Sequence, residues 1–352
     1  MLVRLLTTAL LALALAAPAE ALGAVPDRFY GTSYDGGLRE APADVQTEAW
    51  RKMAANGVES ARSVFSWQRA QGGEGDPFDF TVTDRLVGDA SEQGVELLPI
   101  VADTPVWARA RVEDGWPERT ADFAKYIRAL VERYGPDGQF WDERPEVPER
   151  PLRYWQIYNE PGPTDRYAPV LRTAHRQVKK ADPGAKIVLA GLTGTYEGAP
   201  WDVLRYLYRR GGIKKRWFDV AAMHLYTGKA ENVDDGVRLF RRVMKRNGDR
   251  RTPVWLTEFG ITASKGRTTA PRSQRTLRTT DEGMASFLDV AYRSLARKHR
   301  RLRLQRAYWY TWASSYEPGS GIFEFAGLNR YADGELDARP ALASYRAVAR
   351  RN

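Results

Sequence analysis

Short apolar segments alternate with longer amphipathic segments along almost the whole of this chain of 352 residues. The short segments end too soon to be helices and are rich in β-branched and aromatic residues, which predicts buried strands. The longer segments repeat apolar residues at helical spacing. The expected strands are 29–33, 58–65, 95–101, the first part of 154–161, 187–192, 218–226, 254–257 and 307–312. The expected helices are 45–56, 83–93, 123–134, 167–180, 201–210, 237–244, 284–295 and 340–350.

Eight strands that alternate with eight helices predict a parallel sheet closed into a single (β/α)8 barrel of the α/β class. No linker, composition shift or short internal repeat divides the pattern, so residues 22–352 are expected to form one domain. The length is within the usual range for such a barrel. The connection from Pro136 to Pro151 is rich in proline and acidic residues. It is long for its position, and its sequence assigns it no function.

The first 21 residues have the pattern of a secretory signal peptide. Arg4 supplies a positive start, 5–17 is an apolar run, and Ala19 and Ala21 form a small-x-small cleavage site. The run is too short to cross a bilayer comfortably. We therefore expect residues 1–21 to be removed and the mature protein to be secreted, without stable membrane insertion. The chain has no cysteine, which excludes disulfides and lipid attachment at a cysteine.

The chain carries a formal net charge of +10. A basic exported protein could favour anionic polysaccharides or a negatively charged cell surface. An arginine-rich surface produced by biased codon usage explains the charge equally well. The basic residues are dispersed over many segments without a recognition motif, so no nucleic-acid partner is expected. No metal site or cofactor is expected, because cysteine and paired histidines are absent. We expect a monomer.

Two of the expected strands deliver a glutamate at their carboxyl end. Glu160 follows the strand that begins at residue 154, and Pro161 stops the strand because proline has no N–H to donate. Glu258 follows the apolar strand at 254–257, and Gly260 is expected to start a turn. In a barrel these strand ends lie on one rim. Two glutamates there are what acid/base chemistry with a carboxylate nucleophile requires.

The motifs Asn159-Glu160-Pro161 and Thr257-Glu258-Phe259-Gly260 resemble signatures of the large clan of retaining (β/α)8 glycoside hydrolases. That clan places an Asn-Glu pair after strand four and a second glutamate after strand seven. The resemblance spans essentially the whole mature chain. Together with the expected signal peptide, it implies a secreted, retaining β-glycoside hydrolase that cleaves a polysaccharide or oligosaccharide by double displacement. Glu160 would be the general acid and base, and Glu258 would be the nucleophile that forms a glycosyl–enzyme ester.

The resemblance extends to residues on other strands. Arg62 follows strand two, and His224 and Tyr226 follow strand six. Arg62 and Tyr226 would keep Glu258 ionised by charge and by hydrogen bonding, although Arg62 could also be an ordinary buried ion-pair partner. Asn159 would contact the 2-hydroxyl of the sugar. His224 is either a substrate-binding residue or a core histidine with its hydrogen bonds satisfied.

Three tryptophans are further candidates for sugar binding. Trp309 and Trp312 have opposite parity on the eighth strand, so one is expected to face the mouth of the barrel and the other the helices. Trp312 is nearer to the carboxyl end and is the preferred sugar platform. Trp107 either lines the cleft or packs at a helix cap.

One departure from the clan pattern concerns the substrate. Many clan members have another polar residue after Asn-Glu-Pro, whereas this chain has Gly162 and Pro163. That loop borders the expected cleft, so the sugar, its linkage and endo or exo action stay open. Two other functions are considered: a catalytically silent carbohydrate-binding barrel and a transglycosidase. The presence of both glutamates argues against the silent barrel, whereas a transglycosidase shares the same ester intermediate.

Overall fold

The computed structural model describes residues 24–350 except 112, 114 and 195–197, so the expected signal peptide lies outside the described part. Eight parallel strands pair in the order β5-β4-β3-β2-β1-β8-β7-β6. They are β1 (Tyr30–Ser33), β2 (Ser60–Ser66), β3 (Glu96–Ala102), β4 (Tyr154–Ile157), β5 (Lys186–Val188), β6 (Ala221–Tyr226), β7 (Val254–Gly260) and β8 (Leu304–Trp309). Backbone hydrogen bonds from Leu189 to Val220 and from His224 to Leu192 join the two ends of the sheet. The predicted (β/α)8 barrel is confirmed.

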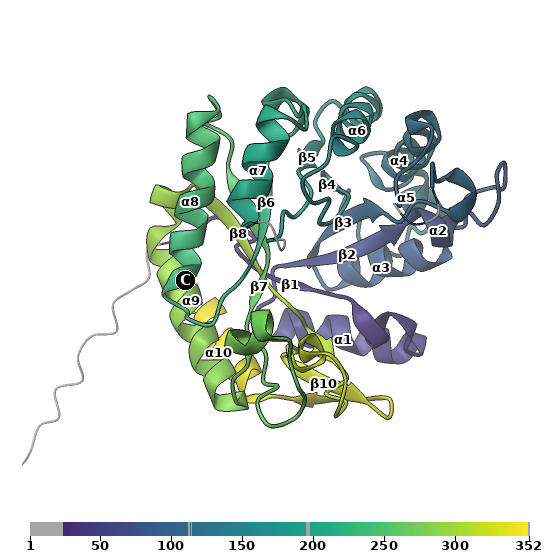
Figure 1. Ribbon diagram of the computed structural model, residues 1–352. Helices are drawn as coiled ribbons and strands as arrows, with labels where there is room; N and C mark the ends of the chain where they lie inside the picture. Colours follow the sequence, from purple (N-terminus) through teal and green to yellow (C-terminus); the bar gives the residue numbers. More distant parts are fainter. Residues whose placement is uncertain (1–23, 112, 114, 195–197, 351–352) are drawn as a thin grey trace, which may run out of the picture.

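Helices surround the strands on the outside (Figure 1). The helices that come after the eight barrel strands in turn are α1 (Ala43–Ala55), α3 (Thr81–Glu92), α4 (Thr120–Tyr134), α6 (Tyr167–Ala181), α7 (Pro200–Arg209), α8 (Asn232–Arg246), α9 (Asp281–Leu302) and α10 (Pro340–Ala349). Two shorter helices are α2 (Trp67–Ala70) and α5 (Gln139–Glu143). No helix in the described part of the chain is both long and apolar enough to cross a membrane.

The strands are apolar because both of their faces are covered. One large buried cluster fills the space between the sheet and the helices. A smaller cluster fills the barrel interior and includes Leu98, Val188 and Trp255. The guanidinium of Arg306 lies 4.1 Å from the ring centroid of Trp255 and pairs with Glu96. The interior is thus packed, and a ligand can enter only at the rim.

The carboxyl ends of three strands differ from the prediction by three residues or more. Strand β5 stops at Val188. Strand β7 instead continues to Gly260, because Glu258 pairs with His224 and Gly260 pairs with Tyr226 of the neighbouring strand β6. Glu258 therefore lies inside a strand. Residues before and after it in the sequence also pair with β6, and this pairing holds the backbone of Glu258 in place. Strand β8 starts and ends three residues earlier than predicted.

Two connections contain structure that the sequence did not reveal. Between Pro136 and Pro151 lies α5, whose Phe140 and Trp141 are buried, so this segment closes the core. After β8 the chain forms a three-stranded sheet before α10. Its strands are β9 (Ala313–Ser314), β10 (Asn329–Ala332) and β11 (Glu335–Ala338), and the 3₁₀ helix η5 (Ile322–Phe325) lies between β9 and β10. This insertion adds a wall beside the mouth of the barrel.

Candidate active site

The two glutamates lie on the same rim of the barrel, one within a strand and the other just beyond the end of a strand. Glu258 lies within β7 and exposes 11% of its side chain. Glu160 lies just beyond β4 and exposes 37%. The chain adopts positive φ angles of 64° at Tyr158 and 48° at Glu160, which is uncommon for residues other than glycine. Backbone strain of this kind is a frequent feature of active sites, and here it turns Glu160 into the mouth of the barrel.

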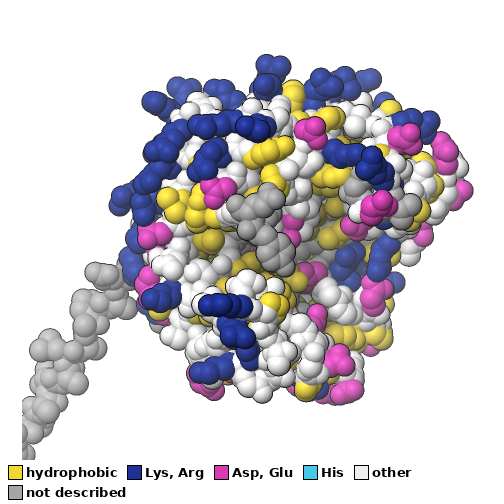
Figure 2. Space-filling view, in the orientation of Figure 1, with side chains coloured by type: hydrophobic (Ala, Val, Ile, Leu, Met, Phe, Trp, Pro, Cys, Tyr) yellow, Lys and Arg dark blue, Asp and Glu magenta, His cyan; other side chains and the backbone are white. Residues whose placement is uncertain are grey.

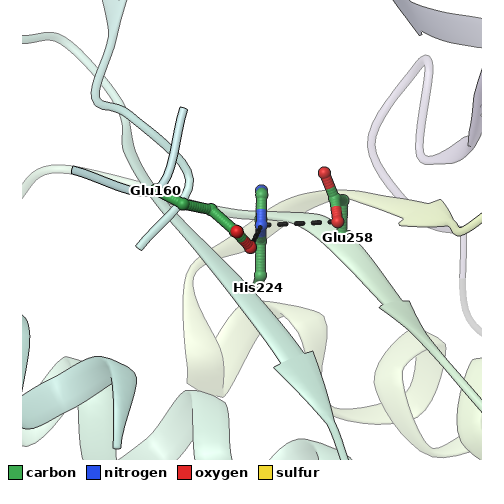
Figure 3. Close-up of side chains that lie close together, drawn as sticks. All are labelled: Glu160, His224 and Glu258. Atoms are coloured by element: carbon green, nitrogen blue, oxygen red, sulfur yellow. Dashed lines mark hydrogen bonds and ion pairs between the residues drawn. The ribbon is translucent and has the colours of Figure 1, made fainter. Parts of the chain in front are cut away.

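His224 lies between the two glutamates (Figure 3). Its Nδ1 is 2.7 Å from Oε1 of Glu160 and 3.4 Å from Oε2 of Glu258. One carboxylate oxygen from each glutamate and one ring nitrogen all lie within 4.8 Å of one another. The ring also packs against Gly191, where a Cβ atom would fall 1.8 Å from Nε2. Any side chain at position 191 would therefore displace the histidine.

Arg62 is buried and makes three side-chain hydrogen bonds. Its guanidinium donates to Glu258 Oε1 at 2.5 Å, to Gln156 Oε1 at 2.7 Å and to Asn159 Oδ1 at 2.5 Å. The bond to Glu258 compensates the buried charge of both partners. The bond to Asn159 uses the amide oxygen, so the amide NH2 group is left to donate into the cleft. Arg62 thus aligns two residues that the sequence linked to the reaction.

The surroundings of Glu258 favour its ionised form. Burial alone would raise the pKa of this carboxyl, but the charges of His224 and Arg62 and the hydrogen bonds from Tyr226 and Arg62 outweigh burial and lower the pKa. The Tyr226 hydroxyl donates to Glu258 Oε2 at 2.6 Å. Burial and the charge of Glu258 raise the pKa of Tyr226 well above its usual value. Tyr226 is therefore a neutral donor to a carboxylate at neutral pH.

A cleft of about 900 Å³ opens above these residues and is lined by all six of Arg62, Asn159, Glu160, His224, Tyr226 and Glu258. It also contains residues that the sequence analysis missed. Asp35 lies two residues after β1, Tyr310 directly follows β8, and Phe323 comes from η5. The position of Asp35 and Tyr310 just past a barrel strand is a signal that could have identified them. Phe323 belongs to the unpredicted insertion.

The three tryptophans proposed as sugar contacts do not line the cleft. Trp309 is fully buried against Phe259 and Phe287, and its Nε1 donates to a backbone carbonyl. Trp312 is also fully buried, so the preferred sugar platform was wrong. The parity argument failed because β8 ends at Trp309 and the chain beyond it no longer alternates. Trp107 is half-buried and packs edge-on against Trp67, which agrees with the packing alternative.

A second hollow of about 680 Å³ lies on the other side of Glu160. It shares Asn159 and Glu160 with the main cleft and is lined by residues that come after β2, β3 and β4. Trp116, in this hollow, stacks on Tyr158 at a ring separation of 4.8 Å and an interplanar angle of 11°. The surface around Glu160 thus has room for a ligand longer than the main cleft alone would hold.

Glu160, His224 and Glu258 form the one group of three potential metal ligands found among the described residues. Two carboxylates and an imidazole are a common donor set for a divalent metal. The guanidinium of Arg62 already compensates Glu258, however, and Tyr226 occupies its other oxygen. The chemistry that these contacts support is acid/base and nucleophilic catalysis by the side chains themselves.

Asp35 is a partly buried carboxyl inside the cleft. It accepts a 2.6 Å hydrogen bond from Thr311 Oγ1. Burial raises its pKa to about 6, and the negative charge of Glu258 adds to this effect, which the hydrogen bond from Thr311 only partly offsets. The folded protein therefore holds the Asp35 proton more tightly than the unfolded chain does. Ionised Asp35 destabilises the folded state above pH 6, and this penalty disappears as the pH falls towards 4.

We expect the Asp35→Asn variant to be more stable than the wild type at pH 7 by about 1 kcal/mol, because its amide oxygen can still accept from Thr311. The difference should shrink between pH 6 and pH 4, where Asp35 takes up a proton in the folded state while the unfolded chain is still mostly ionised. Urea midpoints measured at pH 4, 5 and 7 check this. A stabilisation of equal size at all three values would show that the charge of Asp35 is not its cause.

Comparison with known proteins extends the sequence resemblance. A family model described as "Glycosyl hydrolase catalytic core" matches residues 172–317. This range contains His224, Tyr226 and Glu258, whereas Arg62 and Glu160 precede it. A search of curated proteins by sequence found no match.

Several glycoside hydrolases of known structure share the fold. A family 39 glycoside hydrolase from the gut symbiont Bacteroides cellulosilyticus WH2 has a TM-score of 0.69 at 16% identity, over 92% of this chain and 64% of that protein. The family 1 β-glucosidase from Thermotoga maritima has a TM-score of 0.63 at 11% identity, over 93% and 98%. A family 5 mannosidase from Rhizomucor miehei has a TM-score of 0.59 at 14% identity, over 93% of each chain. This chain thus spans about two thirds of the length of the first neighbour.

At these identities the structural likeness concerns the fold, whereas the family match concerns the sequence of residues 172–317 itself. The two findings agree on the fold of a glycoside hydrolase. The resemblance drawn from the two glutamate motifs is confirmed: this chain carries a match to the glycosyl hydrolase catalytic core on the (β/α)8 fold of glycoside hydrolases.

Proposed function

We propose that this protein is a secreted, retaining β-glycoside hydrolase that cleaves O-glycosidic bonds of a polysaccharide or oligosaccharide. The observation that carries the proposal is the placement of Glu160 and Glu258, whose nearest carboxylate oxygens lie within 4.8 Å on one rim. Retaining enzymes hold the two carboxyl groups roughly 5–5.5 Å apart, whereas inverting enzymes keep them roughly 6.5–9.5 Å apart to admit a water between them. The short separation supports direct attack by a carboxylate.

The reaction proceeds in two balanced steps. In the first, a Glu258 oxygen bonds to the anomeric carbon, the glycosidic C–O bond breaks, and Glu160 gives its proton to the departing oxygen. In the second, Glu160 takes a proton from water, the water oxygen bonds to the anomeric carbon, and the ester to Glu258 breaks. The surroundings of each residue fit these roles: Glu258 is buried and held ionised, whereas Glu160 is partly exposed to incoming water.

Three neighbours assist the two glutamates. Arg62 and Tyr226 hold the carboxylate of Glu258 in one orientation and stabilise its charge when the ester breaks. Asn159 is held by Arg62 with its amide NH2 free to donate to the sugar. A hydrogen bond to the 2-hydroxyl strengthens as positive charge develops at the anomeric centre, so it selectively lowers the barrier.

The lining of the cleft favours an uncharged sugar. Among the described lining residues, the carboxyl groups of Asp35, Glu160 and Glu258 face one arginine, Arg62, which is already paired with Glu258. Asp235 also lines the cleft and pairs with Arg238 at 2.8 Å. A uronic acid or sulfated sugar would meet these carboxylates at close range, and like charges repel strongly where water is excluded. The positive net charge of the chain therefore does not describe the cleft. The proposed substrate is a neutral β-linked glycan.

The proposal is tested on purified protein that lacks residues 1–21. A panel of neutral β-linked polysaccharides and aryl β-glycosides is assayed, with the isosteric Glu258→Gln variant as control. NMR spectra recorded during hydrolysis should show the β-anomer of the released sugar first, and the control should be inactive. An α-anomer formed first would contradict retention, and transfer products in place of the free sugar would indicate a transglycosidase. Failure to cleave any glycoside, with the protein folded, would contradict the proposed function.

A further inference from the structure

Three basic segments far apart in the sequence lie at the same end of the barrel. They are residues 209–216, 242–251 and 297–303. Each segment includes the end of one helix (α7, α8 and α9 in turn) and continues towards the next strand (β6, β7 and β8 in turn). These three strands are neighbours in the sheet. We call the surface formed by the three segments the basic face. It lies at the amino ends of the strands, whereas Glu160 and Glu258 lie at the carboxyl ends.

Contacts between the segments make this surface continuous. Lys215 Nζ donates to the backbone carbonyl of Gly248 at 3.0 Å and joins the first segment to the second. Lys214, Lys215 and Asn247 also line one shallow pocket. Arg303 donates to the backbone carbonyl of Arg251 at 2.6 Å and joins the third segment to the second. The basic face is therefore one surface and not three separate patches.

The charge of the basic face exceeds that of the whole protein. The three segments contain 15 Lys and Arg residues and one acidic residue, Asp249, which gives them a formal charge of +14. The whole chain has +10, so all other residues together carry −4. Figure 2 shows Lys and Arg side chains crowded over the part of the surface that contains α7 and α8, with acidic side chains more frequent on the opposite side. The basic character of this protein is thus concentrated in one place.

The cations of the basic face are exposed and not neutralised. All of them are exposed except Lys298, which forms an ion pair with Asp234 at 2.8 Å. Among the described residues, no carboxylate lies within 4 Å of any of the other fourteen. Asp249 is buried and accepts a hydrogen bond from the Tyr208 hydroxyl, so it neutralises little of the positive charge of the basic face.

Stability does not account for such a surface. Cations in the last turn of a helix interact favourably with the helix dipole, but this explains one or two per helix end. Fourteen uncompensated charges in 25 residues repel one another and destabilise the folded state. An anionic partner would remove that repulsion, so the arrangement is suited to binding.

We propose that the basic face binds an anionic polysaccharide. The three segments contain no Phe, Trp or Tyr, so they lack the rings on which single-stranded nucleic acids stack their bases. The large hydrophobic side chains that the described protein exposes are Val82, Val106 and Val290, and all three lie outside the basic face. A lipid bilayer would therefore find no apolar side chain here to bury. The repeated carboxylates or sulfates of an acidic polysaccharide need only a dense array of cations.

The basic face and the catalytic cleft lie at opposite ends of the barrel, and the ligands proposed for them differ. The cleft carries a surplus of carboxyl groups and favours a neutral glycan, whereas the basic face is at the other end of the barrel. A protein held on an anionic polysaccharide by its basic face would keep the mouth of the cleft open. Binding by the basic face does not depend on the proposed catalytic function and can be measured without it.

The test compares two variants that lose the same charge. One removes four cations of the basic face: Lys214→Gln, Arg216→Gln, Lys245→Gln and Arg246→Gln. The matched control removes four exposed cations from other helices: Arg51→Gln, Lys125→Gln, Arg128→Gln and Arg172→Gln. Affinity for polygalacturonate is measured by co-sedimentation at about 0.1 M salt, where exposed charges more than about 10 Å apart are largely screened. Duplex DNA and vesicles rich in anionic lipid serve as competing ligands.

We expect the wild type to bind polygalacturonate, the basic-face variant to lose about tenfold or more in affinity, and the control to lose about twofold or less. Circular dichroism verifies that both variants are folded. An equal loss in the two variants would show that net charge alone drives binding and would overturn the proposed site. Tighter binding to DNA or to vesicles than to polygalacturonate would overturn the assignment to polysaccharide. Absence of binding by the wild type would also overturn it.

Discussion

The Glu258→Ala variant should lose turnover on every glycoside substrate, by roughly 10⁴-fold or more, because no glycosyl–enzyme ester can form without the nucleophile. Removal of this carboxylate also leaves the buried Arg62 without its charged partner, which costs about 3–5 kcal/mol of stability. The isosteric Glu258→Gln variant keeps an oxygen that can accept from Arg62 and should fold more readily. Both variants are assayed with an aryl β-glycoside and checked for folding by circular dichroism.

Glu324→Ala is the matched control for the loss of a carboxylate near the cleft. Glu324 belongs to η5 and bonds to Ser315 at the surface, so its removal should leave turnover unchanged within about twofold. Turnover by folded Glu258→Gln within about tenfold of the wild type would exclude Glu258 as the nucleophile. Equal losses in Glu324→Ala and Glu258→Gln would point to a general effect of charge at the rim.

The Glu160→Ala variant should respond differently, since a substrate with a good leaving group needs no proton in the first step. Its ester should accumulate, because hydrolysis of the ester lacks its base. Azide can enter the space that the side chain vacates, and Glu160 is already partly exposed at the mouth. We expect azide to increase the turnover of this variant about tenfold or more and to yield the β-glycosyl azide. Turnover and product anomer are measured by absorbance and NMR.

The same reagent separates the roles of the two glutamates. In Glu258→Ala, azide would attack the substrate directly from the nucleophile side and give the α-glycosyl azide. Opposite anomers from the two variants are therefore expected. If both variants gave the same anomer, or if azide accelerated neither, the assignment of acid and nucleophile would be incorrect. This experiment also tests the short distance between the carboxylates, since only a retaining site places its nucleophile in direct contact with the sugar.

The sequence by itself determined the architecture and the rim that holds the reaction. Alternating strand and helix patterns are local properties of the chain, and with eight of each they lead to a closed parallel barrel. Glu160 and Glu258 could be placed on that rim because the carboxyl ends of parallel strands share one edge. The resemblance to the clan of retaining glycoside hydrolases placed Arg62 and Tyr226 beside Glu258, and both hydrogen-bond to it in the structure.

The orientation of side chains near strand ends was decided by tertiary structure. Trp312 was the preferred sugar platform because it is nearer to the carboxyl end of the expected strand, but β8 ends at Trp309 and the chain beyond it leads into the inserted three-stranded sheet, where Trp312 is buried. Asp35 and Thr311 meet in the cleft although they come from opposite ends of the barrel sequence. Such contacts depend on where each strand stops and how its neighbours pair, which local patterns do not encode.

The distribution of charge gives a second example. In the sequence the basic residues are dispersed over many segments, which made a single binding surface difficult to foresee. In the structure, 209–216, 242–251 and 297–303 converge because β6, β7 and β8 are neighbours and their preceding helices end on the same side. The composition of the chain gives its net charge but does not tell where the charged side chains lie in space. The electrostatic field depends on distances in space, and only the fold brings these cations together at the end of the barrel away from an acidic cleft.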